Sequence, residues 1–189
     1  TQGDPNGIGY EVIIKTLEDN RILEICTPII YGSKSALNQH IKKEHKENLK
    51  FHFISDTEEA NHASPNFLDC VEGDFNVEFG VGSKESGISA FKALEKAVID
   101  LKEGKIDVLV TAPINKDNIQ SENFNFPGHT EYLAAQDDKK ESLMFMVSDR
   151  LKISVVTGHI PLNEISQAIT SESIFDKIVS MEKSLKLDF

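Results

Sequence analysis

The sequence predicts an α/β fold, with a mostly parallel or mixed sheet flanked by helices. Short apolar runs alternate along the chain with longer segments whose apolar residues recur at helical spacing. The runs at residues 106–110 and 153–156 are almost continuously apolar, which is typical of strands covered on both faces of a parallel sheet. The composition, with 39% hydrophobic and 27% charged residues, is that of a globular protein. A length of 189 residues favours one domain, or one domain and part of another.

The first half of the chain is expected to alternate between helices and strands, and it includes one strand-turn-helix unit. Residues 10–17 have helical spacing, with Glu11 in the first turn, where the helix dipole favours an acid. Residues 28–31 form a short apolar strand that ends at Gly32, and a helix through Leu37 and Ile41 follows it. Residues 49–54 alternate as a strand. Residues 55–74 are polar, and we expect irregular surface chain there.

The second half continues the alternation. Residues 84–102 place apolar side chains on one face of a helix about 30 Å long, at 1.5 Å per residue. The strand at 106–110 follows directly, and two more strands are expected at 143–147 and 153–156, before a helix at 173–187. A glycine-rich turn normally follows a strand, and a final helix normally leads back to the sheet. We therefore expect a piece that is incomplete at both ends.

Charge and cysteine content exclude several classes of protein. The chain has 31 acidic and 20 basic residues, and a formal net charge of −11 disfavours nucleic acids and anionic lipid surfaces as partners. No apolar run approaches the roughly 20 residues that span a bilayer. Cys26 and Cys70 lack the spacing of a zinc or redox motif. These features predict a cytoplasmic protein without a membrane segment.

Polar residues gather where two of the expected strands end. In open α/β sheets, ligands bind beyond the carboxyl ends of the strands. Residues 106–110 run into Thr-Ala-Pro-Ile-Asn-Lys at 111–116, which makes Lys116 a candidate catalytic residue. Its ammonium suits a phosphate, a carboxylate or a proton transfer. The alternative is an exposed lysine that opens a helix.

A turn at residues 126–128 leads directly into a short helix. His129 and Thr130 therefore lie at or near its N-terminus, and they present an imidazole and a hydroxyl beside free backbone N–H groups. Phosphates are held in this way at helix starts. The alternative is a turn histidine followed by an ordinary N-cap threonine.

His159 follows the apolar run at 153–156 and lies between Gly158 and Pro161, which constrain its backbone. A neutral imidazole there could ligate a metal. One histidine is not a metal site, because a site needs about three protein ligands or more. A hydrogen-bonded structural histidine is the alternative.

Four motifs together resemble one family. They are GDPNGIGYE at residues 3–11, TAPINK at 111–116, PGHTEYLA at 127–134 and VVTGHIPL at 155–162. In this order and spacing they resemble the 4-hydroxythreonine-4-phosphate dehydrogenase family of vitamin B6 (pyridoxine) biosynthesis. The resemblance covers nearly the whole chain and makes residues 1–189 the N-terminal part of a two-domain dehydrogenase.

The resemblance carries further expectations. It implies a fold similar to the isocitrate and isopropylmalate dehydrogenases, a homodimer, and an active site between two domains. It implies NAD-dependent oxidation of 4-phosphohydroxy-L-threonine, followed by decarboxylation of the β-keto acid. Such enzymes use a divalent metal (Zn, Mg, Co or Mn) held by three histidines. Position by position, His159 matches one metal ligand, His129 and Thr130 match a substrate-binding pair, and Lys116 falls in a motif that lines the same cleft.

Two departures from the family pattern qualify these expectations. Tyr10 stands where many members have proline, which affects only how the helix starts. The other two metal histidines and most of the NAD site belong to a C-terminal portion outside these residues, so we expect the fragment itself to be inactive. The alternatives are a dehydrogenase of another phosphorylated hydroxy acid or of a dihydrodiol, or a phosphate-binding α/β domain without catalysis.

Overall fold

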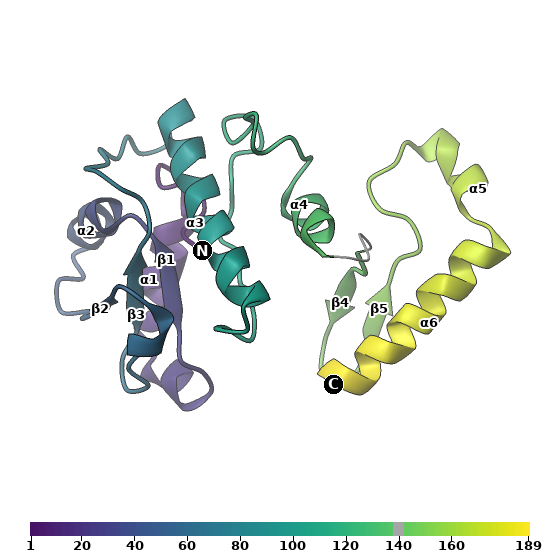
Figure 1. Ribbon diagram of the computed structural model, residues 1–189, viewed down its shortest axis with the longest axis horizontal. Coiled ribbons are helices and arrows are strands. Elements are labelled where there is room, and N and C mark those ends of the chain that lie inside the picture. The colour runs from purple at the N-terminus through teal and green to yellow at the C-terminus, as the bar shows by residue number, and fades with distance from the viewer. Residues whose placement is uncertain (138–141) are drawn as a thin grey trace. The chain divides into compact units, whose positions relative to one another are not determined.

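A computed structural model describes residues 1–137 and 142–189 (Figure 1). The chain divides into two compact units, Thr1–Gln136 and Asp137–Phe189. Each unit has a sheet of its own, with three strands in the first and two in the second. The expected α/β class is confirmed, whereas the strands form two separate sheets.

The sheet of the first unit is parallel throughout. Its strands are β1 (Ile29–Gly32), β2 (His52–Ile54) and β3 (Asn66–Asp69), with β3 in the centre. In the register, Phe67 of β3 pairs with Ile30 on one side and with Phe53 on the other. The two expected strands at 28–31 and 49–54 are present as β1 and β2, and β2 covers only the last three residues of the expected range.

Helices cover both faces of this sheet (Figure 1). Alternate strand residues point to opposite faces. Ile30 and Phe67 pack with α1 (Gly9–Leu17) and α2 (Lys34–Lys43), whereas Tyr31 and Leu68 pack with α3 (Lys84–Lys102). These three helices agree with the helices that the spacing predicts. Short 3-10 turns occupy Asn20–Glu24 and Thr57–Glu59.

The prediction of irregular chain over residues 55–74 is wrong, because it includes the central strand β3. The strand has only four residues, and polar residues surround it, so its alternation is short. Its first side chain, Asn66, is fully buried and shapes the preceding loop: it accepts from the backbone N–H of Asn61 at 2.7 Å and donates to the carbonyls of Pro28, Asn61 and Ser64. An asparagine, which sequence alone would place at the surface, is thus buried and binds the loop before β3 to the start of the sheet.

The prediction of a buried strand at residues 106–110 is also wrong. The segment pairs with no strand in the described residues, and Val108 and Val110 are 74% and 77% exposed. The backbone of Thr1 contacts the end of the segment, accepting from the N–H of Ala112 at 3.2 Å while its amino group donates to Val110 O at 2.7 Å. Residues 105–113 and β1 line a groove of about 820 Å³. Without a paired neighbour along its length, the apolar run stays exposed.

The second unit contains a hairpin and a long helix. Strands β4 (Phe145–Val147) and β5 (Lys152–Ser154) are antiparallel, and a 3-10 turn (Leu162–Glu164), α5 (Ile165–Ala168) and α6 (Ser171–Asp188) follow. The expected strands at 143–147 and 153–156 are present in shifted form, but they are neither parallel nor buried. Met146 and Val147 are each 53% exposed. The expected C-terminal helix is confirmed.

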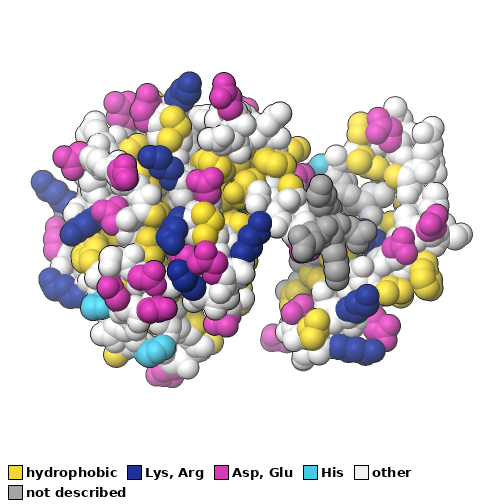
Figure 2. Space-filling model, viewed as in Figure 1, with side chains coloured by type: hydrophobic (Ala, Val, Ile, Leu, Met, Phe, Trp, Pro, Cys, Tyr) yellow, Lys and Arg dark blue, Asp and Glu magenta, His cyan; other side chains and the backbone are white. Residues whose placement is uncertain are grey.

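The surface mixes charges of both signs. On the face drawn in Figure 2, Lys and Arg side chains of the first unit are interspersed with Asp and Glu, and hydrophobic side chains lie between them. In the described residues, no helix combines the length and the apolar character that crossing a membrane requires.

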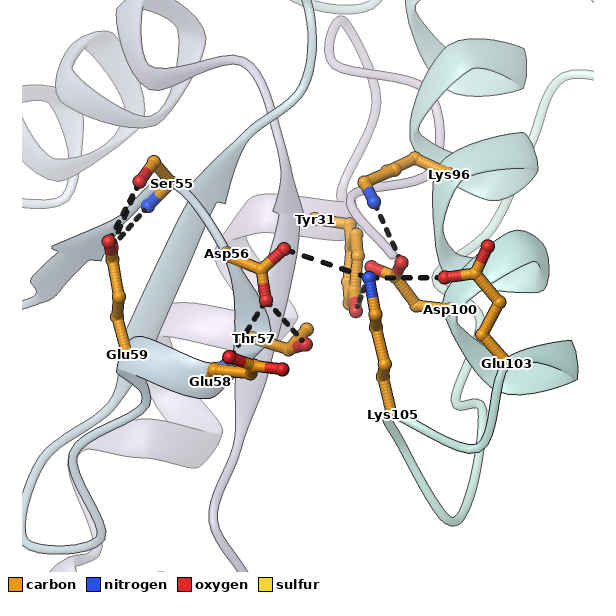
Figure 3. Close-up of polar contacts among 10 residues, drawn as sticks. All are labelled: Tyr31, Ser55, Asp56, Thr57, Glu58, Glu59, Lys96, Asp100, Glu103 and Lys105. Atoms are coloured by element: carbon orange, nitrogen blue, oxygen red, sulfur yellow. Dashed lines mark hydrogen bonds and ion pairs between the residues drawn. The ribbon is translucent and has the colours of Figure 1, made fainter.

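A buried polar cluster fastens α3 to β1 (Figure 3). The hydroxyl of Tyr31 donates to Oδ2 of Asp100 at 2.9 Å, and Lys96 pairs with Oδ1 of the same carboxylate at 2.7 Å. Asp100 is fully buried and Tyr31 is 2% exposed. Burial, followed by the hydrogen bond to Asp100, raises the pKa of Tyr31 well above its ordinary value. The hydroxyl therefore stays protonated and remains a donor to the carboxylate.

We expect Tyr31→Phe to lower the free energy of unfolding by about 1–3 kcal/mol, because it leaves a buried carboxylate oxygen without its donor. Urea denaturation followed by circular dichroism measures this loss. Lys15→Met is the control, because it breaks an ion pair with Glu11 on the exposed side of α1. Equal midpoints for Tyr31→Phe and the unchanged protein would contradict the assignment.

Candidate functional site

The segment that carries Lys116 is held by a side-chain cap. Oδ1 of Asn115 accepts from the backbone N–H groups of Asp117 and Asn118, at 3.0 and 3.3 Å. The N–H of Ile119 donates to the carbonyl of Asn115, and the Ile119 side chain is buried. Asparagine favours turns of this kind because its short side chain competes for nearby backbone donors. The turn leaves the Lys116 side chain exposed.

Asn118 joins this segment to the glycine-rich run and to α3. Its Nδ2 donates to Oδ2 of Asp4 and to Oγ of Ser86, both at 2.9 Å. The backbone N–H of Asp4 donates to the carbonyl of Pro113 at 2.9 Å. Gly3 lies against the same backbone with φ at +69°, where a Cβ would collide with Pro113. Two motifs that are far apart in the sequence therefore meet here.

Helix α4 (His129–Gln136) carries the third motif. Its residue Tyr132 is buried. The centroid of the Tyr132 ring lies 5.9 Å from that of Phe91 of α3 and 5.2 Å from that of Phe124. Phe126, just before the helix, lies 5.6 Å from Phe124 in an edge-to-face arrangement. This aromatic packing fixes where the helix begins, and so it fixes the position of His129.

Lys116 and His129 lie in the same neighbourhood. A Cβ built on Gly128 would be 3.7 Å from Cε of Lys116, which places the lysine stem beside the residue before His129. The lysine charge also acts on the imidazole, as one of the causes that lower its pKa. Thr130 is exposed in the first turn of the same helix. The structure therefore brings together three of the four candidate residues.

The imidazole of His129 is held in its neutral form. Burial is the largest cause that lowers its pKa, and the positive charges of the Thr1 amino group and of Lys116 add to it. Its Nε2 is buried and has no hydrogen-bond partner in the described residues. Buried polar atoms are normally paired, so this nitrogen is suited to a ligand. At neutral pH it can donate or accept one hydrogen bond.

His159 belongs to the second unit. It is exposed and follows β5, in a tight turn where the N–H of Ile160 donates to the carbonyl of Gly158 at 3.0 Å. Over residues 1–137 and 142–189, no group of three or more His, Cys, Asp or Glu side chains is placed to hold a metal. Within these ranges, His159 is therefore a single donor rather than a metal centre.

The sequence reasoning overlooked two residues that build this site, Asn118 and Gln120. Asn118 makes the bridge described above, and Gln120 donates to the carbonyl of Lys116 at 2.9 Å. Both lie a few residues beyond the motif that contains Lys116, in a polar stretch without periodicity. No spacing rule singles them out. The side chain of Asn118 contacts Asp4 and Ser86, which are distant in sequence, and Gln120 contacts nearby backbone carbonyls that carry no sequence signal.

We expect the imidazole of His129 to titrate below the ordinary histidine value of about 6.5. Lys116→Met should raise that midpoint, because it removes a like charge, whereas Lys15→Met on α1 should leave it unchanged. Histidine-selective NMR over pH 4–8 measures both changes. Because the folded pKa is lowered, this group contributes stability above about pH 6.5 that is lost as the pH falls. An unchanged midpoint in Lys116→Met would refute the proximity of the two groups.

Comparison with known proteins identifies relatives over the whole chain. The 4-hydroxythreonine-4-phosphate dehydrogenase of Bacteroides thetaiotaomicron is 44% identical over 190 residues, an alignment that covers 100% of this chain and 52% of that protein. A proposed D-threonate 4-phosphate dehydrogenase of Fusobacterium nucleatum is 32% identical, covering 97% of this chain and 56% of the relative. The chain thus spans about half the length of these relatives.

Solved structures and a family model agree with these relatives. The crystal structure of a 4-hydroxythreonine-4-phosphate dehydrogenase from Burkholderia phymatum superposes with a TM-score of 0.84 at 29% identity, covering 97% of this chain and 56% of that one. Residues 24–189 match the model of a family described as pyridoxal phosphate biosynthetic protein PdxA. Because that match covers most of the sequence, the chain belongs to the PdxA family.

Proposed function

We propose that the full-length protein is an NAD-dependent dehydrogenase of 4-phosphohydroxy-L-threonine, whose β-keto acid product then loses carbon dioxide. One observation carries the proposal: the Lys116 side chain lies beside Gly128 at the start of α4, next to His129, whose buried Nε2 has no partner among the described residues. The relative from Bacteroides thetaiotaomicron, at 44% identity, bears the name of that activity. A phosphorylated substrate fits a helix N-terminus that has a lysine beside it.

The residues of the first unit bind the phosphate in this proposal. The ammonium of Lys116 supplies a positive charge, and the first N–H groups of α4 add donors and the positive end of the helix dipole. Thr130 donates its hydroxyl. His129 is neutral, so it donates one hydrogen bond to the phosphate without requiring a proton from solvent. The exposure of Lys116 favours this binding role over proton transfer, which a buried, desolvated lysine performs better.

The metal and NAD enter the proposal as contributions from the complete protein. A divalent metal, such as Zn, Mg, Co or Mn, would lower the pKa of the bound substrate hydroxyl and so favour hydride transfer to NAD. The described residues do not by themselves form a site for it, because His159 is one donor of the three or more that are needed. We propose that His159 supplies this one ligand, and that the others lie outside these residues. A homodimer in the cytoplasm remains part of the same proposal.

A second candidate is the oxidation of D-threonate 4-phosphate. The relative from Fusobacterium nucleatum, at 32% identity, favours it by its name. Both substrates carry a terminal phosphate, and they differ at the carbon next to the carboxylate, where one has an amino group and the other a hydroxyl. The phosphate-binding residues described above serve both substrates equally. Comparing kcat/KM for the two compounds in the full-length protein decides between them.

We expect Lys116→Met and His129→Asn in the full-length protein to raise the KM for 4-phosphohydroxy-L-threonine by about 10- to 100-fold, because each removes a charge-assisted contact to the phosphate. The KM for NAD should stay within about twofold, since the change concerns substrate binding. Initial-rate measurements of NADH formation give both constants. Phosphate binding without any NADH formation by the unchanged protein, with metal supplied, would instead support a binding domain without catalysis.

His159→Ala in the full-length protein should lower both the bound metal and the turnover, by about 100-fold or more in turnover, because it removes a metal ligand. Metal analysis after dialysis and NADH assays at saturating substrate measure the two effects. His52→Ala, at an exposed position of β2, is the matched control. Unchanged metal content in His159→Ala would remove this residue from the metal site.

A further inference from the structure

The side-chain amide of Gln120 connects the two loops of the proposed phosphate site. Its Nε2 donates to the carbonyl of Lys116 and to the carbonyl of Phe126, both at 2.9 Å. The first carbonyl belongs to the residue that carries the ammonium. The second lies three residues before His129. One amide group, using both of its hydrogens, thus joins the backbone of the two motifs.

Few other polar contacts could perform this function at that point of the chain. Pro127 follows Phe126 and has no N–H to donate, so the loop cannot be fastened through its own amide there. The ring of Phe126 is held by Phe124 and Tyr132, 5.6 and 5.5 Å away between centroids. This packing orients the Phe126 side chain, whereas the amide of Gln120 holds the Phe126 carbonyl relative to Lys116.

We infer that Gln120 is a positioning residue, which sets the separation between the Lys116 ammonium and the His129 imidazole. This inference rests on the proposed phosphate site. Gln120 need not touch the substrate, because it acts through backbone carbonyls. Groups on separate segments bind a phosphate together only when their spacing is right. Loosening the loop that Gln120 fastens therefore weakens substrate binding more than it slows the chemical step.

The chain contains a matched glutamine that makes the same kind of bridge elsewhere. Nε2 of Gln39 on α2 donates to the carbonyls of Ser35, at 3.1 Å, and of Phe75, at 2.6 Å. As with Gln120, the first acceptor lies four residues earlier in the sequence. Gln39 additionally accepts from the N–H of Val77, so its removal costs at least as many hydrogen bonds. A Gln39 variant therefore shows how much a loss of stability alone changes substrate binding.

The test compares Gln120→Met and Gln120→Ala with Gln39→Met in the full-length enzyme. Methionine keeps the length of the side chain and removes both donors, and alanine repeats the loss with a smaller side chain. For both Gln120 variants we expect the KM for 4-phosphohydroxy-L-threonine, and the inhibition constant of inorganic phosphate, to rise about fivefold. The kcat should change by less than about twofold. Gln39→Met should lower the Tm and leave both binding constants unchanged.

Two outcomes overturn the inference. In the first, both Gln120 variants keep the unchanged protein's KM and inhibition constant. In the second, Gln39→Met raises these constants as much as they do, which reduces the effect to general destabilisation. Lys116→Met, measured in parallel, distinguishes a failure of the Gln120 inference from a failure of the proposed phosphate site. If Lys116→Met raises the KM and the Gln120 variants do not, only the positioning role fails; if none of the three raises it, the phosphate site itself fails.

Discussion

Helix α3 buries two of its faces, and both the sheet and the candidate site depend on this double packing. Ala93 and Ala97 face the sheet, where their small side chains allow the helix to approach Tyr31 and Leu68 closely. Phe91 and Val98 face the other way and pack with Phe124 and Tyr132 under α4. A change in the position of α3 would therefore move the start of α4 relative to the sheet. The buried carboxylate of Asp100, paired with Tyr31 and Lys96, holds the helix against β1 by directional contacts in addition to apolar ones (Figure 3).

The candidate phosphate site contains a lysine and a helix N-terminus inside a strongly negative chain. A formal net charge of −11 would repel a phosphate at long range, but salt screens exposed charges beyond about 8–10 Å at physiological ionic strength. Within that distance, the Lys116 ammonium and the N-terminus of α4 favour an anion, whereas Glu131 in the first turn of the helix opposes one. The pKa of His129 is lowered mainly by burial, and nearby positive charges add to this effect. A net negative charge therefore disfavours partners that need an extended basic surface, and it does not exclude a small anion held by a few local groups.

Periodicity predicted the elements that bury a regular face, and it failed where pairing decides the structure. The helix at 84–102 is predictable because its apolar residues lie on one side over about five turns. Strand β3 was missed because four residues in a polar stretch carry almost no pattern, and its key residue is a buried asparagine. Residues 106–110 were misread for the opposite reason: an apolar run fits a strand, but a strand needs a neighbour to pair with. Motif spacing singled out Lys116, His129 and Thr130 as candidates, but not Asn118, whose partners are distant in sequence, or Gln120, whose partners are nearby backbone carbonyls without a sequence signal. The likeness to isocitrate dehydrogenases stays a prediction.

The chemistry of the proposed reaction is divided unequally along the chain. The first unit supplies an ammonium, a hydroxyl, helix N–H groups and a neutral imidazole, all of which suit an anion. The second unit supplies a single exposed imidazole at His159, in a turn that Gly158 and Pro161 restrict. Holding a phosphate needs only what the first unit has, whereas activating a hydroxyl through a metal needs at least two ligands more than His159. The chain spans about half the length of the relatives that it matches. In the proposed function, residues 1–189 therefore supply groups for phosphate binding and a single metal ligand.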